Sequence, residues 1–226
     1  MLTELNLQPL WLSLQISLYT TIILMLVGTP LALWLASISG KKKAVFEALV
    51  ALPLVLPPTV LGFYLLIVLS PDGAVGQVWA GMGFAPLTFS MTGLVIGSVI
   101  YSLPFAVQPL MHGFEMLGKR PLEVASSLGA NKIDRFFSVI LPLTRRHYLV
   151  AFTLAFAHTM GEFGVILMIG GNIPGVTQVA SIAIYDHVEA MEYGQAHVLS
   201  AILLVLSFSV LTIVYGLNRK NARGGY

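Results

Sequence analysis

The stretch WLSLQISLYTTIILMLVGTPLALWLASISGKKK, residues 11–43, decides which kind of fold this chain can adopt. Residues 11–39 contain no charged side chain, and three consecutive lysines, Lys41 to Lys43, follow almost at once. An α-helix rises about 1.5 Å per residue, so roughly 20 apolar residues cross the hydrocarbon core of a membrane, which is about 30 Å thick. The stretch therefore predicts a membrane-spanning helix with a basic flank.

The rest of the chain has the same character. Of its 226 residues, 57% are hydrophobic and 10% are charged, and the mean hydropathy is +0.86. Soluble domains carry about 25% charged residues. We predict an all-α integral membrane protein with one transmembrane domain, residues 1–226, whose five spans lie at about 11–39, 44–69, 87–111, 148–169 and 197–217.

The placement of the basic residues predicts the orientation of the spans. All twelve Lys and Arg residues follow the first span, lie between the third and fourth, or follow the fifth. The last group comprises Arg219, Lys220 and Arg223. Because basic loops stay on the cytoplasmic side, five spans fit an N-out, C-in protein. A sixth span would break this pattern.

A long inner segment, residues 112–146, holds half of the basic residues. Pro121 suits the first turn of a helix, and Gly129 suits a left-handed helix end. Asn131 and Asp134 have the spacing of a cap for a second helix. That helix is predicted to present one apolar face, formed by Ile133, Phe136, Phe137 and Ile140. The first helix is either a ligand for a groove on another protein or a solvated connector on the membrane surface.

Three stretches resemble those of a known family. EVASSLGANKIDRFFSVILP, residues 123–142, resembles the cytoplasmic signature of ATP-binding-cassette (ABC) importer permeases, although Val124 replaces the usual Ala. LPLVLPPTVLGFYLL, residues 52–66, and GEFGVILMIGGNIPGVTQVASIAIY, residues 161–185, resemble permeases of oxyanion importers, most closely those for molybdate. Sulfate permeases share the Gly-Glu-Phe-Gly and Gly-Asn-Ile-Pro elements.

The resemblance implies a fold, partners and a location. It implies a bundle like that of a type I ABC importer permease, in a bacterial inner membrane, assembled from two permease copies. A coupling helix would dock on a separate ATPase subunit through Glu123, Ala125, Ser126, Leu128 and Gly129. The two ATPase subunits would hold ATP and magnesium, and an extracytoplasmic molybdate-binding protein would deliver the anion. This chain itself would bind no cofactor and no nucleic acid.

A second group of residues is expected along the route of the anion. Glu162 is an acidic residue deep within a span, where a charge is costly, so it should face the bundle interior, paired or protonated. His158 precedes it by one helical turn. The two form either a proton relay or an interhelical hydrogen bond that fixes the packing. The predicted path and gate residues are Pro57, Pro58, Thr59, Glu162, Asn172, Thr177 and Gln178.

Enzyme and metal functions find little support in the sequence. The chain has no cysteine, and His158 with Glu162 is its one pair at ligand-like spacing. GFEMLGKR, residues 113–120, nearly matches a phosphate-binding loop, but Arg120 replaces the Ser or Thr that ligates magnesium. We expect a transport subunit without catalytic residues. The alternatives are tungstate, sulfate or thiosulfate as substrate, and a proton-coupled carrier that uses Glu162 and His158.

Overall fold

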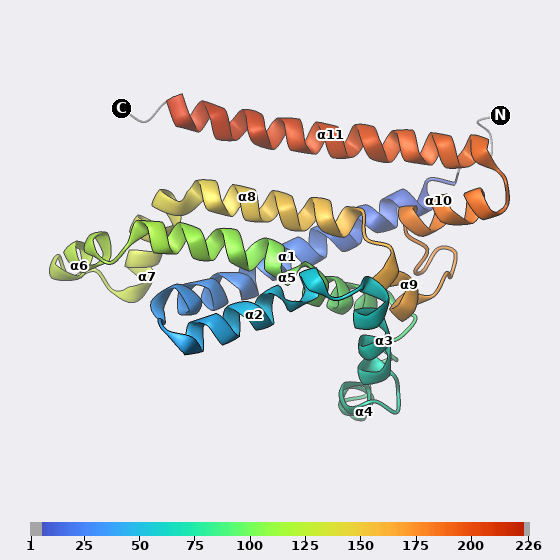
Figure 1. The fold of residues 1–226 in the computed structure, drawn as a ribbon, viewed down its shortest axis with the longest axis horizontal. Helices are drawn as coiled ribbons and strands as arrows, with labels where there is room; N and C mark the ends of the chain where they lie inside the picture. Colours follow the sequence, from blue (N-terminus) through green and yellow to red (C-terminus); the bar gives the residue numbers. More distant parts are fainter. Residues whose placement is uncertain (1–5, 224–226) are drawn as a thin grey trace.

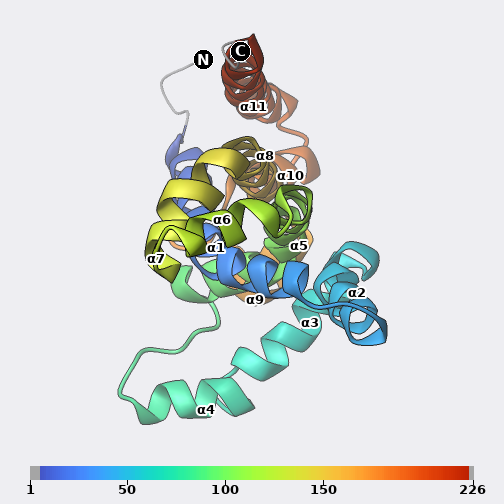
Figure 2. The ribbon, with the colours of Figure 1, turned by 90° about the vertical axis from the view of Figure 1, so that its left-hand side faces the viewer.

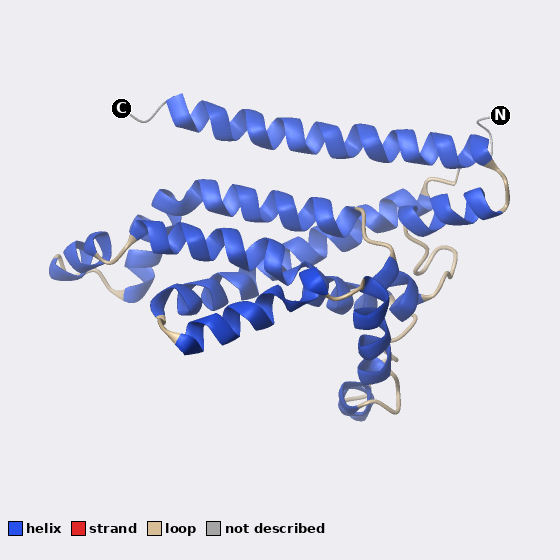
Figure 3. Ribbon diagram, in the orientation of Figure 1, coloured by secondary structure: helices blue, strands red, loops and turns tan. Residues whose placement is uncertain are grey.

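The structure is a computed structural model that describes the backbone of residues 6–223 and the side chains of residues 6–216. The two ends of the predicted domain 1–226, and the side chains of Arg219, Lys220 and Arg223, lie outside the described residues. Within residues 6–223 every regular element is a helix (Figure 3). In chain order these are α1 Gln8–Ser37, α2 Lys41–Val55, α3 Pro58–Leu69, α4 Ala74–Gly81, α5 Met91–Leu117, α6 Arg120–Ser127, α7 Lys132–Arg135, the π-helix η1 Phe136–Ile140, α8 Leu141–Met160, α9 Gly164–Gly170, α10 Ala180–Glu189 and α11 Tyr193–Arg223.

Three long helices, α1, α5 and α8, form the body of the molecule, and α11 runs alongside them with its axis in roughly the same line (Figure 1). Helix α5 packs against both α1 and α8. At the centre, Leu24 of α1, Ala106 of α5 and Ala155 of α8 are fully buried together. The two alanines permit close packing of the helices, as small residues do in membrane bundles. Figure 2 shows α3 and α4 extending from one side of this bundle, while α11 lies on the opposite side.

Three of the predicted spans correspond to unbroken helices. Helices α1, α5 and α11 cover the ranges 11–39, 87–111 and 197–217, with ends that differ by a few residues. Among the described residues, four helical stretches are long and apolar enough to cross a membrane, or five if one bent pair counts as a span. The chain is thus an all-helical membrane protein of four to five candidate spans.

The predicted second span, 44–69, is not one helix. It is divided between α2 and α3 at Leu56 and Pro57, whose ψ angles are both 135° and therefore extended. Two consecutive prolines remove two backbone donors, and each disfavours helical backbone at the residue before it. Helix α3 consequently turns away from the bundle (Figure 1), and the span-like stretch is instead Pro58–Gly81, which combines α3 and α4.

The predicted fourth span, 148–169, is also broken. Helix α8 ends at Met160 and α9 begins at Gly164, and the two are bent by 59° relative to each other. Glu162, expected within a continuous helix, lies in this three-residue break. The predicted inner segment 112–146 likewise has different limits, since α5 continues through Leu117 and α8 begins at Leu141.

The described basic segments gather at one end of the bundle. Helices α6 and α7, the start of α2 and the C-terminal end of α11 lie at that end, and the first turn of α1 lies at the other (Figure 1). This arrangement agrees with the positive-inside pattern of the sequence. The N-out, C-in orientation of the spans stays a prediction.

An ion pair ties α2 to α5 at this end. Lys43 donates a hydrogen bond to Glu115, which raises the pKa of Lys43, and Lys43 also lies 3.7 Å from Glu47. Because the pKa of Lys43 is raised, the contribution of this lysine to stability is present at neutral pH and is lost as the pH rises above the ordinary lysine value of 10.5.

We expect Lys43→Glu or Glu115→Lys alone to lower the melting temperature slightly, because each places like charges side by side. The double exchange should restore most of the loss. A double-mutant cycle of thermal unfolding checks this expectation, and additive losses would contradict the pairing. The effect should be small, since both side chains are partly exposed.

Candidate coupling segment and translocation cavity

The candidate coupling segment, residues 120–140, consists of a helix, a turn and a second helix. Helix α6 ends at Ser127 with Leu128 as its C-cap, and Gly129 follows with a φ of +85°, a left-handed conformation that favours glycine. The Asn131 side chain then accepts hydrogen bonds of 2.9 Å from the backbone N–H groups of Ile133 and Asp134 and forms a capping box. The sequence-based prediction of the glycine end and the cap is confirmed. Arg135 also donates a hydrogen bond of 3.1 Å to Ser126, which ties α7 to α6.

The segment exposes apolar side chains at its tip. Leu128 is 83% exposed, and Val124, Ile133 and Phe137 are exposed as well. By contrast, Leu122 and Phe136 pack against the bundle core. The predicted single apolar face of the second helix is therefore wrong, because the π-turn Phe136–Ile140 changes the helical register and divides these side chains between core and surface.

A cavity of about 500 Å³ lies where the two broken spans meet. The start of α3, the middle of α5, the end of α8 and the start of α9 surround it. Its polar lining is formed by Thr59, Tyr101, His158 and Glu162, and its remaining lining by Pro58, Gly161, Phe163, Gly164, Leu167 and Met168. The volume greatly exceeds the roughly 30 Å³ that one water molecule occupies, so the cavity has room for a small hydrated solute.

Two glycines allow α3 and α9 to approach closely beside this cavity. A Cβ atom on Gly62 would lie 2.7 Å from the Met168 Cβ, and one on Gly164 would lie 2.8 Å from the Pro58 Cβ. Gly97 of α5 admits α9 in the same way, since its Cβ would lie 2.5 Å from Ile169 Cδ1. The short helix α9 therefore packs closely between α3 and α5, because glycines lie at both contacts.

Glu162 is buried without a hydrogen-bond partner. It is 4% exposed, and neither of its carboxyl oxygens forms a hydrogen bond with a described residue. Ser98 of α5 faces it and is fully buried, and its hydroxyl likewise has no partner among the described residues. The backbone carbonyl of Glu162 is satisfied, since it accepts a hydrogen bond of 2.6 Å from Ser181. The unpaired group is thus the carboxyl itself.

His158 belongs to a separate hydrogen-bond chain. Its Nδ1 lies 2.9 Å from Ser102 Oγ, which lies 3.0 Å from Thr159 Oγ1, and Thr159 donates its hydroxyl proton to the carbonyl of Ala155. Each hydroxyl has one proton to donate, so Ser102 donates to Thr159, and His158 Nδ1–H donates to Ser102. The neutral ring therefore has its lone pair on Nε2. His158 and Glu162, which the sequence predicted to act together, line the same cavity but form no direct hydrogen bond.

The predicted path residues divide into two groups. Pro58, Thr59 and Glu162 line the one cavity, and Pro57 directly precedes it as the cap of α3. The other three lie in the loop before α10 and satisfy local partners. Thr177 donates to the carbonyl of Gly170 at 2.7 Å, and both Asn172 and Gln178 donate to Asp186 Oδ2, at 2.6 and 2.9 Å.

This loop arrangement gives a test of a structural role. Replacing Asp186 by Ala removes the acceptor of both amides, which are exposed or partly buried, and we expect a loss of roughly 0.5–1.5 kcal/mol in the free energy of unfolding. Asp72→Ala, in the loop between α3 and α4, serves as the matched control and should change stability little. Thermal unfolding of the purified chain measures both. Equal stability of the two variants would contradict the proposal that Asp186 stabilises the loop by accepting hydrogen bonds from Asn172 and Gln178.

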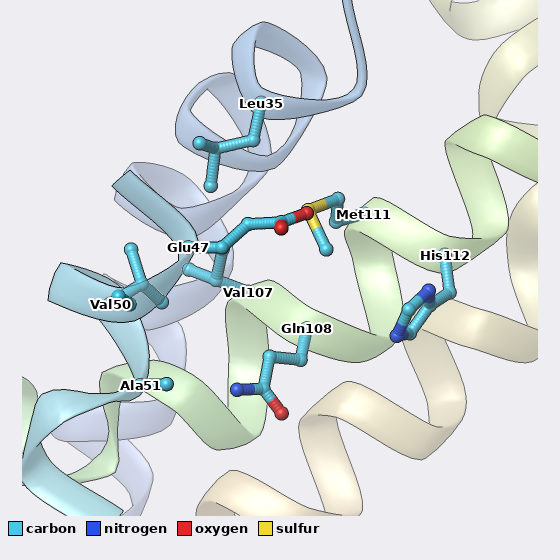
Figure 4. Close-up of a pocket in the computed structure, with 9 residues that line it drawn as sticks. Leu35, Glu47, Val50, Ala51, Val107, Gln108, Met111 and His112 are labelled. Carbon is cyan, nitrogen blue, oxygen red and sulfur yellow. The ribbon is translucent and has the colours of Figure 1, made fainter. Parts of the chain in front are cut away.

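A second pocket, of about 390 Å³, lies nearer the basic end between α1, α2 and α5 (Figure 4). Glu47, Gln108 and His112 are its polar side chains, and Leu35, Val50 and Val107 are among its apolar ones. Sequence reasoning singled out none of these residues. It also missed Ser98, Tyr101 and Ser102, although their i, i+3 and i+4 spacing forms a polar stripe on an otherwise apolar helix that could have indicated a lined path.

Comparison with known proteins identifies the class. Residues 28–223 match the family of binding-protein-dependent transport system inner membrane components, and the chain belongs to this family. It is therefore a multi-pass inner membrane permease subunit of the ABC transporter type, and not itself an enzyme. The family works with a binding protein, as its description states.

The similarity extends to particular relatives. The chain is 52% identical over 221 residues to the molybdenum transport system permease protein ModB of Azotobacter vinelandii, with 98% of each chain covered. It is 33% identical over 188 residues to the sulfate transport system permease protein CysT of Synechocystis, covering 83% of this chain and 65% of CysT. A crystal structure of a bacterial alginate ABC transporter, in complex with its ligand-bound periplasmic protein, superposes on all of this chain and 82% of that one, with a TM-score of 0.76 at 16% identity. At that identity the structural likeness concerns the fold alone.

Proposed function

We propose that the whole chain is the permease domain of an ABC importer for molybdate. The observation that carries the proposal is the 52% identity to a molybdenum transport permease over almost the full length of both chains. The sulfate permease match is lower in identity and shorter, so it supports a related anion chemistry. Tungstate resembles molybdate in charge and shape, and the same site would accept it.

The proposed assembly has four further kinds of partner. A second copy of this chain forms the path with the first, and two ATPase subunits bind ATP and magnesium. An extracytoplasmic binding protein delivers the anion to the outer end, and the lipid bilayer surrounds the bundle.

Coupling is proposed to run through the tip of the α6–α7 segment. Glu123, Ala125, Ser126, Leu128 and Gly129 would dock on the ATPase. Exposed Val124 and Leu128 supply apolar surface for a groove, while Leu122 and Phe136 anchor the segment to the bundle. A movement of the ATPase would thus reach the bundle directly. In this account Glu162 belongs to the path, and the proton-coupled carrier is the rival reading.

Cross-linking tests the docking proposal. The chain has no cysteine, so a Ser126→Cys variant carries a single thiol at an exposed position. We expect a disulfide with a cysteine placed on the facing groove of the ATPase, formed in an ATP-sensitive manner. A cysteine at Met191, which is 77% exposed at the other end, is the control and should not react with the ATPase. Failure at Ser126 in a complex that still transports would contradict the assignment.

Competition tests the substrate. Uptake of labelled molybdate by cells that lack and then regain this chain should survive an excess of sulfate. Uptake that sulfate abolishes would assign the chain to the sulfate branch of its family. Competition by tungstate is expected under the proposal, because the two dianions share the tetrahedral shape.

A further inference from the structure

The cavity between the two broken spans contains a carboxyl group whose charge nothing balances. Glu162 is nine-tenths buried and its oxygens have no partner among the described residues. None of the residues that line the cavity is Lys or Arg. No cation faces an ionised carboxylate here, and Ser98 offers it a neutral hydroxyl. Burial of such a charge is costly unless it is paired. The neutral acid is the form that this site stabilises.

The helices around Glu162 place no Lys or Arg among the cavity residues, as an account of each helix shows. Helix α3 contributes Thr59, α5 contributes Ser98 and Tyr101, and α8 contributes His158. From α9 the lining is apolar, and α1 packs against the neighbouring Phe163 with the apolar Leu12 and Ile16. From α10, Ser181 binds the backbone of Glu162, and Tyr185 contacts the ring of Phe163. The titratable groups are thus two tyrosines and one histidine.

The histidine forms no hydrogen bond with the Glu162 carboxyl. Its Nδ1 proton is donated to Ser102, and its ring is packed between Phe105, at 4.0 Å between ring centroids, and Tyr101, at 4.8 Å. The neutral tautomer satisfies this chain of hydrogen bonds, and its Nε2 is a proton acceptor.

An oxyanion in this cavity would need donors. The oxygens of a tetrahedral oxyanion only accept hydrogen bonds, and the hydroxyls of Thr59 and Tyr101 are donors on the same wall. A neutral carboxyl adds a third donor, whereas a carboxylate removes it and repels a dianion. Glu162 lies in the break between α8 and α9, where a change of helix tilt would move its side chain relative to the other residues of the cavity.

We propose that Glu162 binds a proton that the anion route requires: the protonated carboxyl admits the oxyanion as a hydrogen-bond donor, and its deprotonation closes the route. The proton stays on the carboxyl and is not transported with the anion, so ATP remains the energy source. This inference rests on the proposed import of an oxyanion. It adds a proton site and a role for Glu162 that the import function itself does not require.

The experiment uses the whole transporter complex, reconstituted in vesicles, with ATP-driven molybdate uptake measured over a range of pH. Glu162→Gln keeps the shape of the neutral acid and cannot ionise, and Glu189→Gln, on the exposed face of α10, is the matched control. We expect uptake by the wild type and by Glu189→Gln to fall as the pH rises. Glu162→Gln should transport at neutral pH and exceed the wild type by about tenfold or more at alkaline pH, given the repulsion between a dianion and a nearby carboxylate.

Infrared spectroscopy of the same complex gives a second readout that needs no substrate. The wild type should show the C=O stretch of a protonated carboxyl at neutral pH, and Glu162→Gln should lack it. Absence of this band in the wild type would overturn the proposal. So would an inactive Glu162→Gln in an intact complex of wild-type melting temperature, or a pH profile that Glu162→Gln shares with the wild type. Lack of molybdate uptake by every variant would instead refute the proposed substrate, while the band would still report the proton.

Discussion

A Gly129→Val variant should enter the membrane and fold, yet lose most of its ATP-driven uptake. Gly129 has a φ of +85°, and a Cβ atom at this position would meet nothing within 4 Å. The cost is therefore purely one of backbone conformation, about 1–2 kcal/mol for a left-handed residue and more for a β-branched one. Relief of that strain would move exposed Leu128 out of its docking position. Each 1.4 kcal/mol of binding free energy that is lost in this way weakens the affinity for the ATPase about tenfold.

Two matched variants make this result specific. Gly129→Asn should retain uptake, because Asn adopts the left-handed conformation readily. Gly81→Val, in α4, introduces the same side chain where there is also nothing within 4 Å and where φ is not positive, and it should transport normally. Binding of the purified permease to its ATPase, measured beside uptake, separates uncoupling from misfolding. Normal uptake by Gly129→Val would contradict the role of this turn.

A Gly62→Leu variant is expected to destabilise the whole bundle. The new Cβ would lie 2.7 Å from the Met168 Cβ and 3.2 Å from the Val165 Cα, so backbone as well as side chains would have to move. Overpacking of this kind costs typically 1–3 kcal/mol, and more where the backbone cannot yield. We expect a melting temperature several degrees lower and a loss of uptake. Gly81→Leu is the control that adds the same side chain to open space.

The Gly62 result tests the contact between the two broken spans. If α3 and α9 meet as described, Gly62→Ala should already be harmful, and Gly62→Leu should be worse. Leu should lower the stability more than Ala, because its side chain has the larger volume. Equal stability of Gly62→Leu and Gly81→Leu would mean that α3 does not pack against α9, and the cavity between them would lose its wall.

The sequence predicted the unbroken spans because their signal is local. Residues 11–39 contain no charge and a single internal proline, Pro30, which α1 accommodates. The second span failed because two adjacent prolines, Pro57 and Pro58, ended α2 inside an apolar run that hydropathy reads as continuous. Hydrophobic periodicity also assumed 3.6 residues per turn, and the π-turn Phe136–Ile140 broke that assumption.

The site was predictable only in part, because its residues are assembled from distant parts of the chain. Glu162 was found because a charge is unusual within an apolar run, and Thr59 was predicted as a candidate hydrogen-bond donor along the route. Tyr101 and Ser98 are ordinary residues in an apolar helix, and only the fold brings them beside Glu162. Asn172 and Gln178 were expected along the path, but their amides instead bind Asp186, a partner that spacing alone does not reveal.

One helix joins the two regions on which the proposed mechanism depends. Helix α8 begins directly after the π-turn of the coupling segment and ends at the break that holds Glu162. Its 20 residues span about 30 Å, the thickness of the hydrocarbon core. We infer that a tilt of α6 and α7 reaches the cavity through α8 as a rigid lever. The anion path and the ATPase contact would then be two ends of one element.

The most direct test of the central claim is ATP-driven uptake by the purified transporter complex, containing this chain, its ATPase and its binding protein, in sealed vesicles. The account predicts that labelled molybdate accumulates only when the chain and ATP are both present, and that collapse of the proton gradient leaves accumulation unchanged. Uptake that stops when the proton gradient alone is removed, or that proceeds without ATP, would contradict the importer and favour a proton-coupled carrier.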